Sequence, residues 1–425
     1  MSRPRNVLLV TVDCLRADRL ASAISDGLAP NIEALAAEAT RFDRAFTVAN
    51  ATDPSLTSML TGRIPPNHGV LQNGWGLDAA VPTVARRLRD AGFDTAGIVS
   101  VDHLAHEHSG LGHGFARYAD GDGKYDAIYP ILSRIYDTRA FNLAFGAVKD
   151  RGVGGVTVKD LLRRLGLIQL HERPATHVTA DAIEAIDAVE EPFFAWVHYF
   201  DLHEPRNAPR RLRREHDDRY TAALRHVDAH VGRLVEALEA RDALEETLVV
   251  LTADHGEALG EHGYTGHGRT LFDEELHVPL LLAHPGIPAQ TVEAQVRTID
   301  IAPTILATLG VDTGPLDGAT LLADRAVDGP EDRPLVAMAY PPFGERYAVR
   351  TPAHKLVVDR DAGTVELYDL EADPRERRDI ADASPELVER LLVHLRPWLE
   401  RNETVAEQSV DEETEEMLAA LGYVD

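Results

Sequence analysis

Three short apolar segments constrain the fold of this chain most strongly, because each of them leads into polar residues. They are residues 6–12, 193–197 and 248–252. Continuous apolar runs this short are typical of strands buried on both faces of a parallel sheet. Asp13 follows the first run, and Asp254 comes two residues after the third. Since open α/β sheets bind ligands at the carboxyl ends of their strands, the sequence predicts an α/β fold with a functional site at that end of the sheet.

Helical and strand patterns alternate through the first 330 residues. Helices are predicted at 30–39, 81–92, 179–189, 220–240 and 301–309, and further strands at 95–99 and 278–282. Asp201 and His203 follow the second apolar segment, and His255 follows Asp254. A single Asp at a strand end, such as Asp13, has an alternative explanation as a helix cap. Three strands that all end in Asp or His favour a shared site.

The pattern changes after about residue 330. Short strands at 335–339, 347–350, 355–358 and 366–368 precede a helix at 385–399 and an acidic tail. We therefore expect a catalytic α/β domain over 1–330 and a small α+β subdomain over 331–425 with an antiparallel sheet. Residues 121–175 carry a net charge of +3, unlike the rest of the chain, and are interpreted as an insertion or lid.

The composition is strongly acidic and poor in lysine. There are 43 Lys and Arg against 70 Asp and Glu, giving a net charge of −27. Such a surface suits high salt, where repulsion is screened, and it argues against nucleic acid as a partner. We therefore expect a halophilic protein. Cys14 is the single cysteine, so no intrachain disulfide can form.

The first residues lead into a short strand rather than into the longer apolar region of a signal peptide. Furthermore, no apolar run approaches the length of a transmembrane helix. The expectation from these two features is a cytoplasmic location.

Residues 51–63 have the pattern of a loop that turns into a buried helix. Pro54 suits a first helical turn, and Gly62 suits a helix end. Thr52 would then lie at the positive end of the helix dipole, where an alkoxide and a bound anion are favoured. Alternatively, Thr52 is simply the N-cap residue.

Taken together, these motifs resemble the sulfatases of the alkaline-phosphatase superfamily, over nearly the whole chain. The matching blocks, in order, are Val12 to Asp18, the nucleophile signature Thr52 to Leu56 with Leu60 to Arg63, Asp201 to Pro205, Asp254 to Glu257, Asp300 to Thr304, and Glu366 to Leu370 with Asp373 and Pro374. The resemblance implies a three-layer sandwich around a mostly parallel sheet.

Four positions depart from the family pattern. Sulfatases have Cys or Ser where this chain has Thr52. A maturation enzyme oxidises that residue to formylglycine, which Thr cannot form. Leu56 replaces the signature Arg, and Cys14 replaces the second Asp of the usual pair. The Gly-Lys-x-His motif keeps its histidine as His103 but loses its lysine.

The resemblance also implies a set of site residues. Asp13, Asp254, His255 and the Thr52 oxygen are the expected ligands of one divalent cation, which can be Mn²⁺, Zn²⁺, Mg²⁺ or Ca²⁺. His203 and His267 would contact the substrate anion or the leaving group, or would hold a second metal together with Asp201. His103 and Asp201 are further substrate-binding candidates. Arg16 and Arg63 would orient the site, or form structural ion pairs.

Three functions remain open at this point. The first is a metal-dependent phosphodiesterase or phosphotransferase with Thr52 as nucleophile. The second is a sulfuric ester hydrolase that works without formylglycine, and the third is a non-catalytic protein that binds an anion or glycan. The expected partner is an anionic small-molecule, lipid or glycan ester; the sequence leaves the oligomeric state open.

Overall fold

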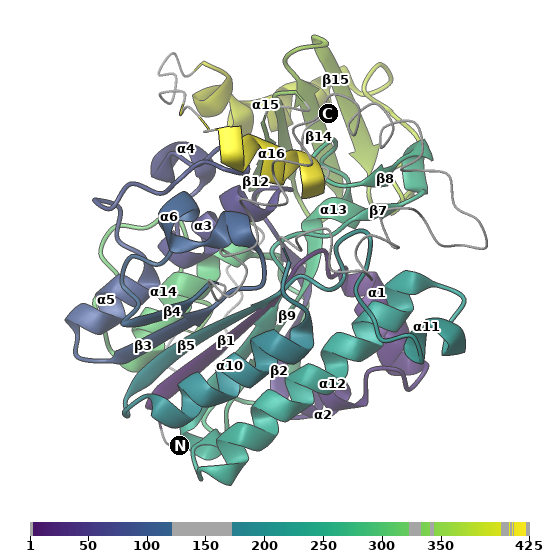
Figure 1. The fold of residues 1–425 in the computed structure, drawn as a ribbon. Helices are drawn as coiled ribbons and strands as arrows, with labels where there is room; N and C mark the ends of the chain where they lie inside the picture. Colours follow the sequence, from purple (N-terminus) through teal and green to yellow (C-terminus); the bar gives the residue numbers. More distant parts are fainter. Residues whose placement is uncertain are drawn as a thin grey trace.

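The computed structural model describes residues 3–120, 172–322, 333–340, 344–400, 408, 410 and 412–421. Within these ranges a nine-stranded sheet forms the centre of the molecule (Figure 1). From edge to edge its strands are β10 (Gln290–Val292), β2 (Ala39–Phe46), β9 (His277–Ala283), β6 (Thr247–Thr252), β1 (Asn6–Val12), β5 (Phe193–Tyr199), β3 (Asp94–Ile98) and β4 (Arg117–Ala119), with β11 (Val296–Arg297) also paired to β2.

The sheet is mostly parallel. β1 lies between β5 and β6 and is parallel to both, and β3 is parallel to β4 and β5. β9 is antiparallel to β2 and β6. All seven residues of β1 are buried, as a strand covered on both faces requires. The predicted α/β class with a mostly parallel sheet is confirmed.

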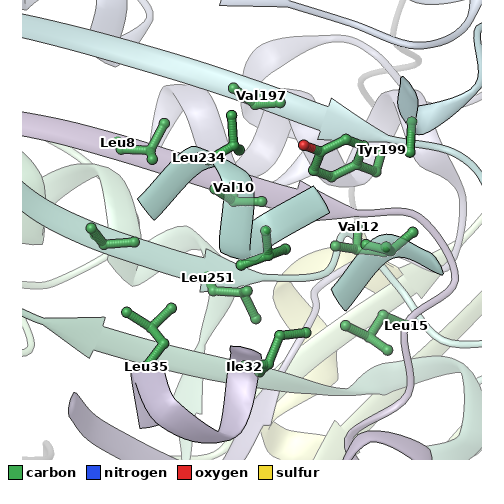
Figure 2. Close-up of a cluster of buried hydrophobic side chains, with 14 of the residues drawn as sticks. Leu8, Val10, Val12, Leu15, Ile32, Leu35, Val197, Tyr199, Leu234 and Leu251 are labelled. Carbon is green, nitrogen blue, oxygen red and sulfur yellow. The ribbon is translucent and has the colours of Figure 1, made fainter. Parts of the chain in front are cut away.

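Helices cover both faces of the sheet. Leu8, Val10 and Val12 of β1 pack in one core with α1 (Ala17–Ser25), α2 (Pro30–Ala37), α10 (Ala175–Ala188) and α12 (Arg219–Ala240), as Figure 2 shows for part of this core. Val7 and Leu9 point the other way, into a core with α3 (Thr52–Thr61), α5 (Val84–Asp90) and α14 (Ile301–Leu309). The alternation of side chains along each strand therefore builds two apolar layers.

A second, four-stranded antiparallel sheet follows near the C-terminus. Its order is β12 (Leu335–Ala339), β13 (Arg346–Arg350), β14 (His354–Asp359) and β15 (Thr364–Asp369), and α15 (Pro385–Leu399) packs against it. The buried Lys355 of β14 pairs with Asp273 and Glu376, at 2.6 Å each, and so ties this sheet to α13 (Asp273–Leu276). The predicted small C-terminal sheet is confirmed, while a domain boundary at residue 330 stays a prediction.

Short elements complete the described chain. They are α4 (Pro65–His68), α6 (His106–Ser109), α11 (Leu212–Glu215), α16 (Glu412–Leu421) and the small hairpin of β7 (Ala258–Leu259) with β8 (Thr265–Gly266). The expected insertion or lid at 121–175 lies almost entirely outside the described residues. Across the described ranges, no helix is both long and apolar enough to cross a membrane.

Three expectations about local structure were wrong. The helix predicted over 81–92 begins only at Val84 and ends at Asp90. The helix predicted over 30–39 ends at Ala37, and the chain enters strand β2 at Ala39. The helix predicted over 179–189 begins four residues earlier, at Ala175, directly after Pro174. Proline fits this position because a helix start leaves its backbone N–H groups without intrahelical partners.

Candidate active site

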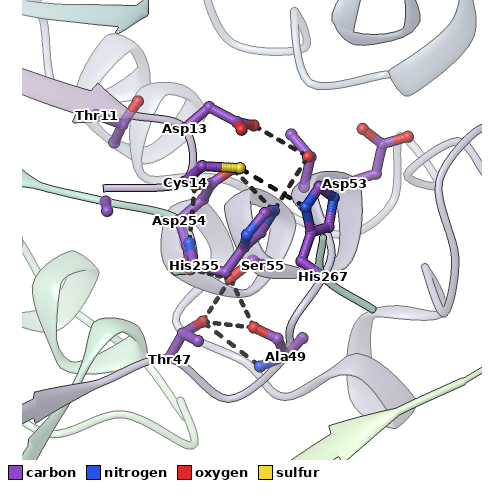
Figure 3. Close-up of polar contacts among 12 residues, drawn as sticks. Thr11, Asp13, Cys14, Thr47, Ala49, Asp53, Ser55, Asp254, His255 and His267 are labelled. Atoms are coloured by element: carbon purple, nitrogen blue, oxygen red, sulfur yellow. Dashed lines mark hydrogen bonds and ion pairs between the residues drawn. The ribbon is translucent and has the colours of Figure 1, made fainter. Parts of the chain in front are cut away.

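The three central strands bring the expected site residues together. β6, β1 and β5 are neighbours and parallel, so Asp254, Asp13 and the segment after Tyr199 meet at one end of the sheet. Helix α3 begins at this end, with Thr52 as its first residue. Figure 3 shows Asp13, Cys14, His255 and His267 turned toward one another there.

Thr52 does not act as the helix cap. Ala51 occupies the N-cap position in an extended conformation, and Thr52 is already helical. Instead, the Thr52 Oγ1 donates to Asp13 Oδ2 at 3.1 Å and lies 3.3 Å from His255 Nε2. A fully buried hydroxyl thus faces two groups that can accept its proton.

His255 presents an unprotonated nitrogen to Thr52. Its Nδ1 lies 2.8 Å from the carbonyl oxygen of Gly256, which only accepts, so Nδ1 carries the proton and Nε2 the lone pair. Burial lowers the His255 pKa to about 4, although the Asp254 carboxylate opposes this shift. The neutral ring can therefore take the Thr52 proton or bind a metal through Nε2.

Glycine is needed at position 256, because the backbone there lies close to the backbone of Glu274. A Cβ at this position would lie 2.1 Å from the carbonyl oxygen of Glu274. No side chain can be accommodated at that distance, so glycine allows the segment after β6 to turn inward.

The carboxylates of Asp13 and Asp254 fit a divalent cation. Asp13 Oδ1, Asp254 Oδ2 and His198 Nε2 are buried and have no hydrogen-bond partner among the described residues. These three residues offer ligand atoms within 4.8 Å of one another. Burial, followed by the neighbouring Asp254 charge, raises the Asp13 pKa well above its usual value. A bound cation would relieve this repulsion and would give the three buried atoms a partner.

His198 is a site residue that sequence reasoning missed. It lies in β5, with Nδ1 2.9 Å from Thr11 Oγ1, and it offers a ligand atom within 4.8 Å of Asp13 and Asp254. The sequence contains a signal for His198. Every second residue of β5 shares a face, and on this face His198 follows the apolar residues Phe194 and Trp196 at the carboxyl end of the strand.

A ring of side-chain contacts leads from Thr52 back to Asp53. The centroid of the His255 ring lies 4.3 Å from the centroid of the His267 ring. The centroids of the His267 and His203 rings lie 5.2 Å apart. His203 stacks on Phe200 at 4.3 Å, and Phe200 meets His103 edge to face at 6.3 Å. The His103 Nδ1 lies 2.7 Å from Asp53 Oδ1 and closes the ring. The predicted residues His103, His203 and His267 are therefore brought together around the start of helix α3.

His203 is not set up as a neutral proton donor through Nε2. Its Nδ1 donates to the carbonyl oxygen of Glu204 at 2.8 Å, which leaves the lone pair on Nε2. Burial and the neighbouring His267 lower the His203 pKa well below its usual value. Donation to a substrate oxygen would require the protonated imidazolium, a state that a bound anion favours.

Asp201 turns away from this ring. Its Oδ1 accepts a hydrogen bond at 3.0 Å from the backbone N–H of Ala175, the first residue of α10. Burial raises the Asp201 pKa to about 8. Among the described residues, Asp201, His203 and His267 do not form a close group of ligand atoms, and the start of α10 binds one oxygen of Asp201; the second metal stays a prediction.

Arg16 and Arg63 lie in different surroundings. Arg16 forms ion pairs with Asp18 at 2.8 Å and Glu261 at 3.0 Å, and donates to the carbonyl oxygen of Glu257. Arg63 follows Gly62 beyond the far end of α3, roughly 15 Å along the helix axis from Thr52. The ion pairs of Arg16 agree with the alternative of a structural role, whereas the role of Arg63 stays a prediction.

Comparisons with known proteins agree with this fold. The sulfatase family model matches residues 5–311, and a model described as N-sulphoglucosamine sulphohydrolase, C-terminal, matches residues 260–403. The chain is 26% identical to the choline-sulfatase of Rhizobium meliloti (strain 1021), over 89% of this chain and 82% of that protein.

Solved structures give the same result. A phosphonate monoester hydrolase from Silicibacter pomeroyi superimposes with a TM-score of 0.70 at 23% identity, covering 96% of this chain and 98% of that one. A structure in complex with its substrate D-glucosamine-2-N,6-O-disulfate has a TM-score of 0.70 at 20% identity, covering 96% and 100%.

The sheet, the helix that carries Thr52 and the carboxylates at the strand ends define a sulfatase-like member of the alkaline-phosphatase superfamily. Within this superfamily, the chain belongs to the sulfatase family.

Proposed function

We propose that the protein cleaves a phosphate ester, with a phosphodiester as the leading substrate class, through Thr52 as an unmodified nucleophile. The supporting observation is the position of the Thr52 hydroxyl, 3.1 Å from Asp13 Oδ2 and 3.3 Å from His255 Nε2. A hydroxyl is a weak nucleophile on its own and needs an adjacent base of this kind.

In the proposed step, Thr52 Oγ1 forms a bond to phosphorus while the bond to the leaving alkoxide breaks. The Thr52 proton passes to His255 Nε2 or Asp13 Oδ2, and the leaving alkoxide is protonated by water or by a neighbouring histidine. Since Thr52 has one hydroxyl, its ester is resolved only when water or an alcohol attacks the phosphorus. Hydrolysis and group transfer are thus both available to this site.

A divalent cation fits the same site. Asp13, Asp254 and His198 supply buried ligand atoms, and His255 Nε2 and Thr52 Oγ1 lie beside them. When bound, such an ion lowers the pKa of a nearby hydroxyl and offsets negative charge on the substrate. His203 and His267 remain the proposed contacts of the substrate anion, with His103 held next to the nucleophile by Asp53.

Sulfate-ester hydrolysis without formylglycine is the second candidate. The similarity to a choline-sulfatase over most of the chain favours it. The loss of the signature arginine weighs against a sulfatase of the usual kind, because Leu56 is fully buried in an apolar core where that arginine would lie.

A substrate panel tests these proposals. Nitrophenyl phosphodiesters, phosphomonoesters and sulfates would be compared at molar KCl with Mn²⁺, Zn²⁺, Mg²⁺ or Ca²⁺. We expect the highest kcat/KM for a phosphodiester. Faster turnover of the sulfate that depends on Thr52 would favour the second candidate. Binding of a sulfated or phosphorylated glycan without turnover of any ester would favour a non-catalytic role.

A further inference from the structure

His226 and His230 form a buried pair on α12, which lies beside α10 (Figure 1) and covers the face of the sheet opposite to α3. The two residues are four positions apart and therefore lie on one side of the helix. Their ring centroids are 4.6 Å apart and the rings meet edge to face. His226 is 8% exposed and His230 is 5% exposed. The proposed reaction uses neither histidine.

The Asp201 carboxyl group reaches the same place from the segment that follows β5. Its Oδ1 lies 4.0 Å from His226 Nε2. Two buried atoms, Asp201 Oδ2 and His230 Nδ1, have no hydrogen-bond partner among the described residues. Because buried polar atoms are nearly always partnered in folded proteins, these two atoms indicate a group that binds between them.

We propose that His226, His230 and Asp201 bind a zinc-class ion between α12 and the segment that follows β5. The site is separate from that of Asp13 and Asp254, which we call the carboxylate site. It also differs from the expected second-metal set, since it uses neither His203 nor His267. It goes beyond the proposed esterase function and does not depend on it.

The separations are close to those of a tetrahedral zinc site. With Zn–N of about 2.0–2.1 Å, the centroids of two tetrahedral imidazoles lie about 5 Å apart, and a nitrogen and an oxygen ligand lie about 3.4 Å apart. The observed values are 4.6 Å between the ring centroids and 4.0 Å between His226 Nε2 and Asp201 Oδ1. Since the ligand atoms are less tightly grouped than the set within 4.8 Å at the carboxylate site, binding requires side-chain rotation that draws them together. Two histidines at i and i+4 of one helix can reach a single zinc ion in this way.

The charges of the three groups agree with a bound cation. Burial lowers the pKa of His226 to about 4, and burial followed by the charges of His226 and Arg233 lowers the pKa of His230 to about 4. Both imidazoles are therefore neutral at pH 7 and retain a lone pair for a metal. Burial raises the Asp201 pKa to about 8, and the Glu172 carboxylate adds to this shift. A divalent ion would favour the ionised form of Asp201 and displace its proton.

The donor types predict which ion is bound and what it does. Two imidazoles favour zinc and related transition metals over Ca²⁺ or Mg²⁺, which prefer oxygen ligands. The Ala175 N–H at the start of α10 donates to Asp201 Oδ1 at 3.0 Å, as a partner that orients a metal ligand does. The ion therefore links α12 to the start of α10 and to the segment that carries His203, two residues after Asp201.

Metal content is the first test. Metal-free full-length protein would be dialysed against Zn²⁺ and its zinc measured by elemental analysis. We expect two zinc ions per chain, one at each site. Asp254→Ala, which removes a ligand of the carboxylate site, should retain one zinc ion. Loss of all zinc from this variant would overturn the proposal of a separate site.

Matched variants assign the retained ion. In the Asp254→Ala background, His226→Gln and His230→Gln should each weaken zinc binding about 100-fold or more, at least the effect of losing a partner that orients a ligand. His177→Gln is the control, because His177 is an exposed histidine on the neighbouring helix α10. It should leave zinc affinity unchanged. Equal zinc affinity in all three variants would contradict the assignment.

A measurement on the wild type covers variants that do not fold. Anomalous diffraction at the zinc edge from crystals of the zinc-loaded protein should show a peak between the His226, His230 and Asp201 side chains. The absence of a peak at this position would refute the proposal, whatever is bound at the carboxylate site. Neither readout involves ester turnover, so failure of the proposed esterase function would leave this result unaffected.

Discussion

Replacing Thr52 by valine is the sharpest perturbation of the proposed mechanism. Valine keeps the branched shape of threonine and removes only the hydroxyl, so it leaves little cavity. The hydroxyl makes one hydrogen bond to a carboxylate, with Asp13 Oδ2 at 3.1 Å. Bonds of this kind contribute about 1.5–3 kcal/mol, well below the usual 5–15 kcal/mol of a folded domain. We therefore expect a folded variant.

The catalytic effect should be far larger than the effect on stability. Removing a nucleophile in covalent catalysis costs on the order of 10⁶ in kcat where it has been measured in a serine protease. For Thr52→Val we expect kcat to fall by about four powers of ten or more. A loss of four powers of ten corresponds to about 5.4 kcal/mol of transition-state stabilisation. Thr52→Ser keeps the hydroxyl and should retain a large part of the activity.

The assay is phosphodiester turnover combined with thermal unfolding of each variant. Thr61→Val is the matched control, because Thr61 is buried in the same helix, α3, and its Oγ1 donates to the Thr57 carbonyl oxygen at the far end. It should leave kcat unchanged. Turnover by Thr52→Val within tenfold of the wild type would refute the mechanism.

The identity of the covalent adduct gives an independent check. Intact-mass and peptide spectra of wild-type protein trapped with substrate should locate the adduct on Thr52. Ser55 is the nearest competing hydroxyl in the sequence, but its Oγ donates to the Asp254 carbonyl oxygen at 2.6 Å and is close to Thr47. An adduct on Ser55 would transfer the nucleophile role to that residue.

Three further predictions concern metal, salt and pH. Asp254→Ala should stay folded but lose the metal of the carboxylate site, and full occupancy by elemental analysis would remove Asp254 from that site. The acidic, lysine-poor composition predicts that the unfolding temperature rises with KCl between about 0.1 M and 2 M, because salt screens the repulsion between surface carboxylates. A flat or falling curve would contradict the halophilic expectation. Burial, then the charge of Arg63, lowers the His68 pKa to about 3, while its Nδ1 accepts from the Val70 N–H and its ring also contacts Ser58. Because the unfolded chain takes up this proton below about pH 6.5, stability should fall toward pH 3 by up to about 1.4 kcal/mol per unit, and His68→Gln should reduce that slope by one proton in chemical denaturation.

The central strands were predictable because burial on both faces leaves an uninterrupted apolar run. Strand β2 was not, since Arg41 and Asp43 are exposed and break its apolar pattern. The preceding helical spacing also extends to Ala39, so periodicity alone placed the helix end two residues too late. Pairing with β9 and β10, which are distant in sequence, makes β2 a strand.

The candidate site was predictable where a residue follows a buried strand within a few positions, as for Asp13, Asp254 and His255. It was not predictable where the direction of a side chain depends on a distant element. Asp201 has the expected position in its motif, but the N-terminus of α10 takes its carboxyl group. His198 lies within a strand rather than after it, and only the alternation of faces reveals that it points at the carboxylates.

Cys14 illustrates why a motif comparison alone is insufficient. In the family pattern this position is a second Asp, so the sequence suggests the loss of one oxygen ligand. In the structure, the left-handed backbone at Cys14 directs its sulfur toward His267 and Glu257 rather than leaving an unused side chain. Exchanging oxygen for sulfur at this position changes which ions are preferred, whichever ester is cleaved. Metal preference and ester preference are therefore separate properties of this site, and each requires its own measurement.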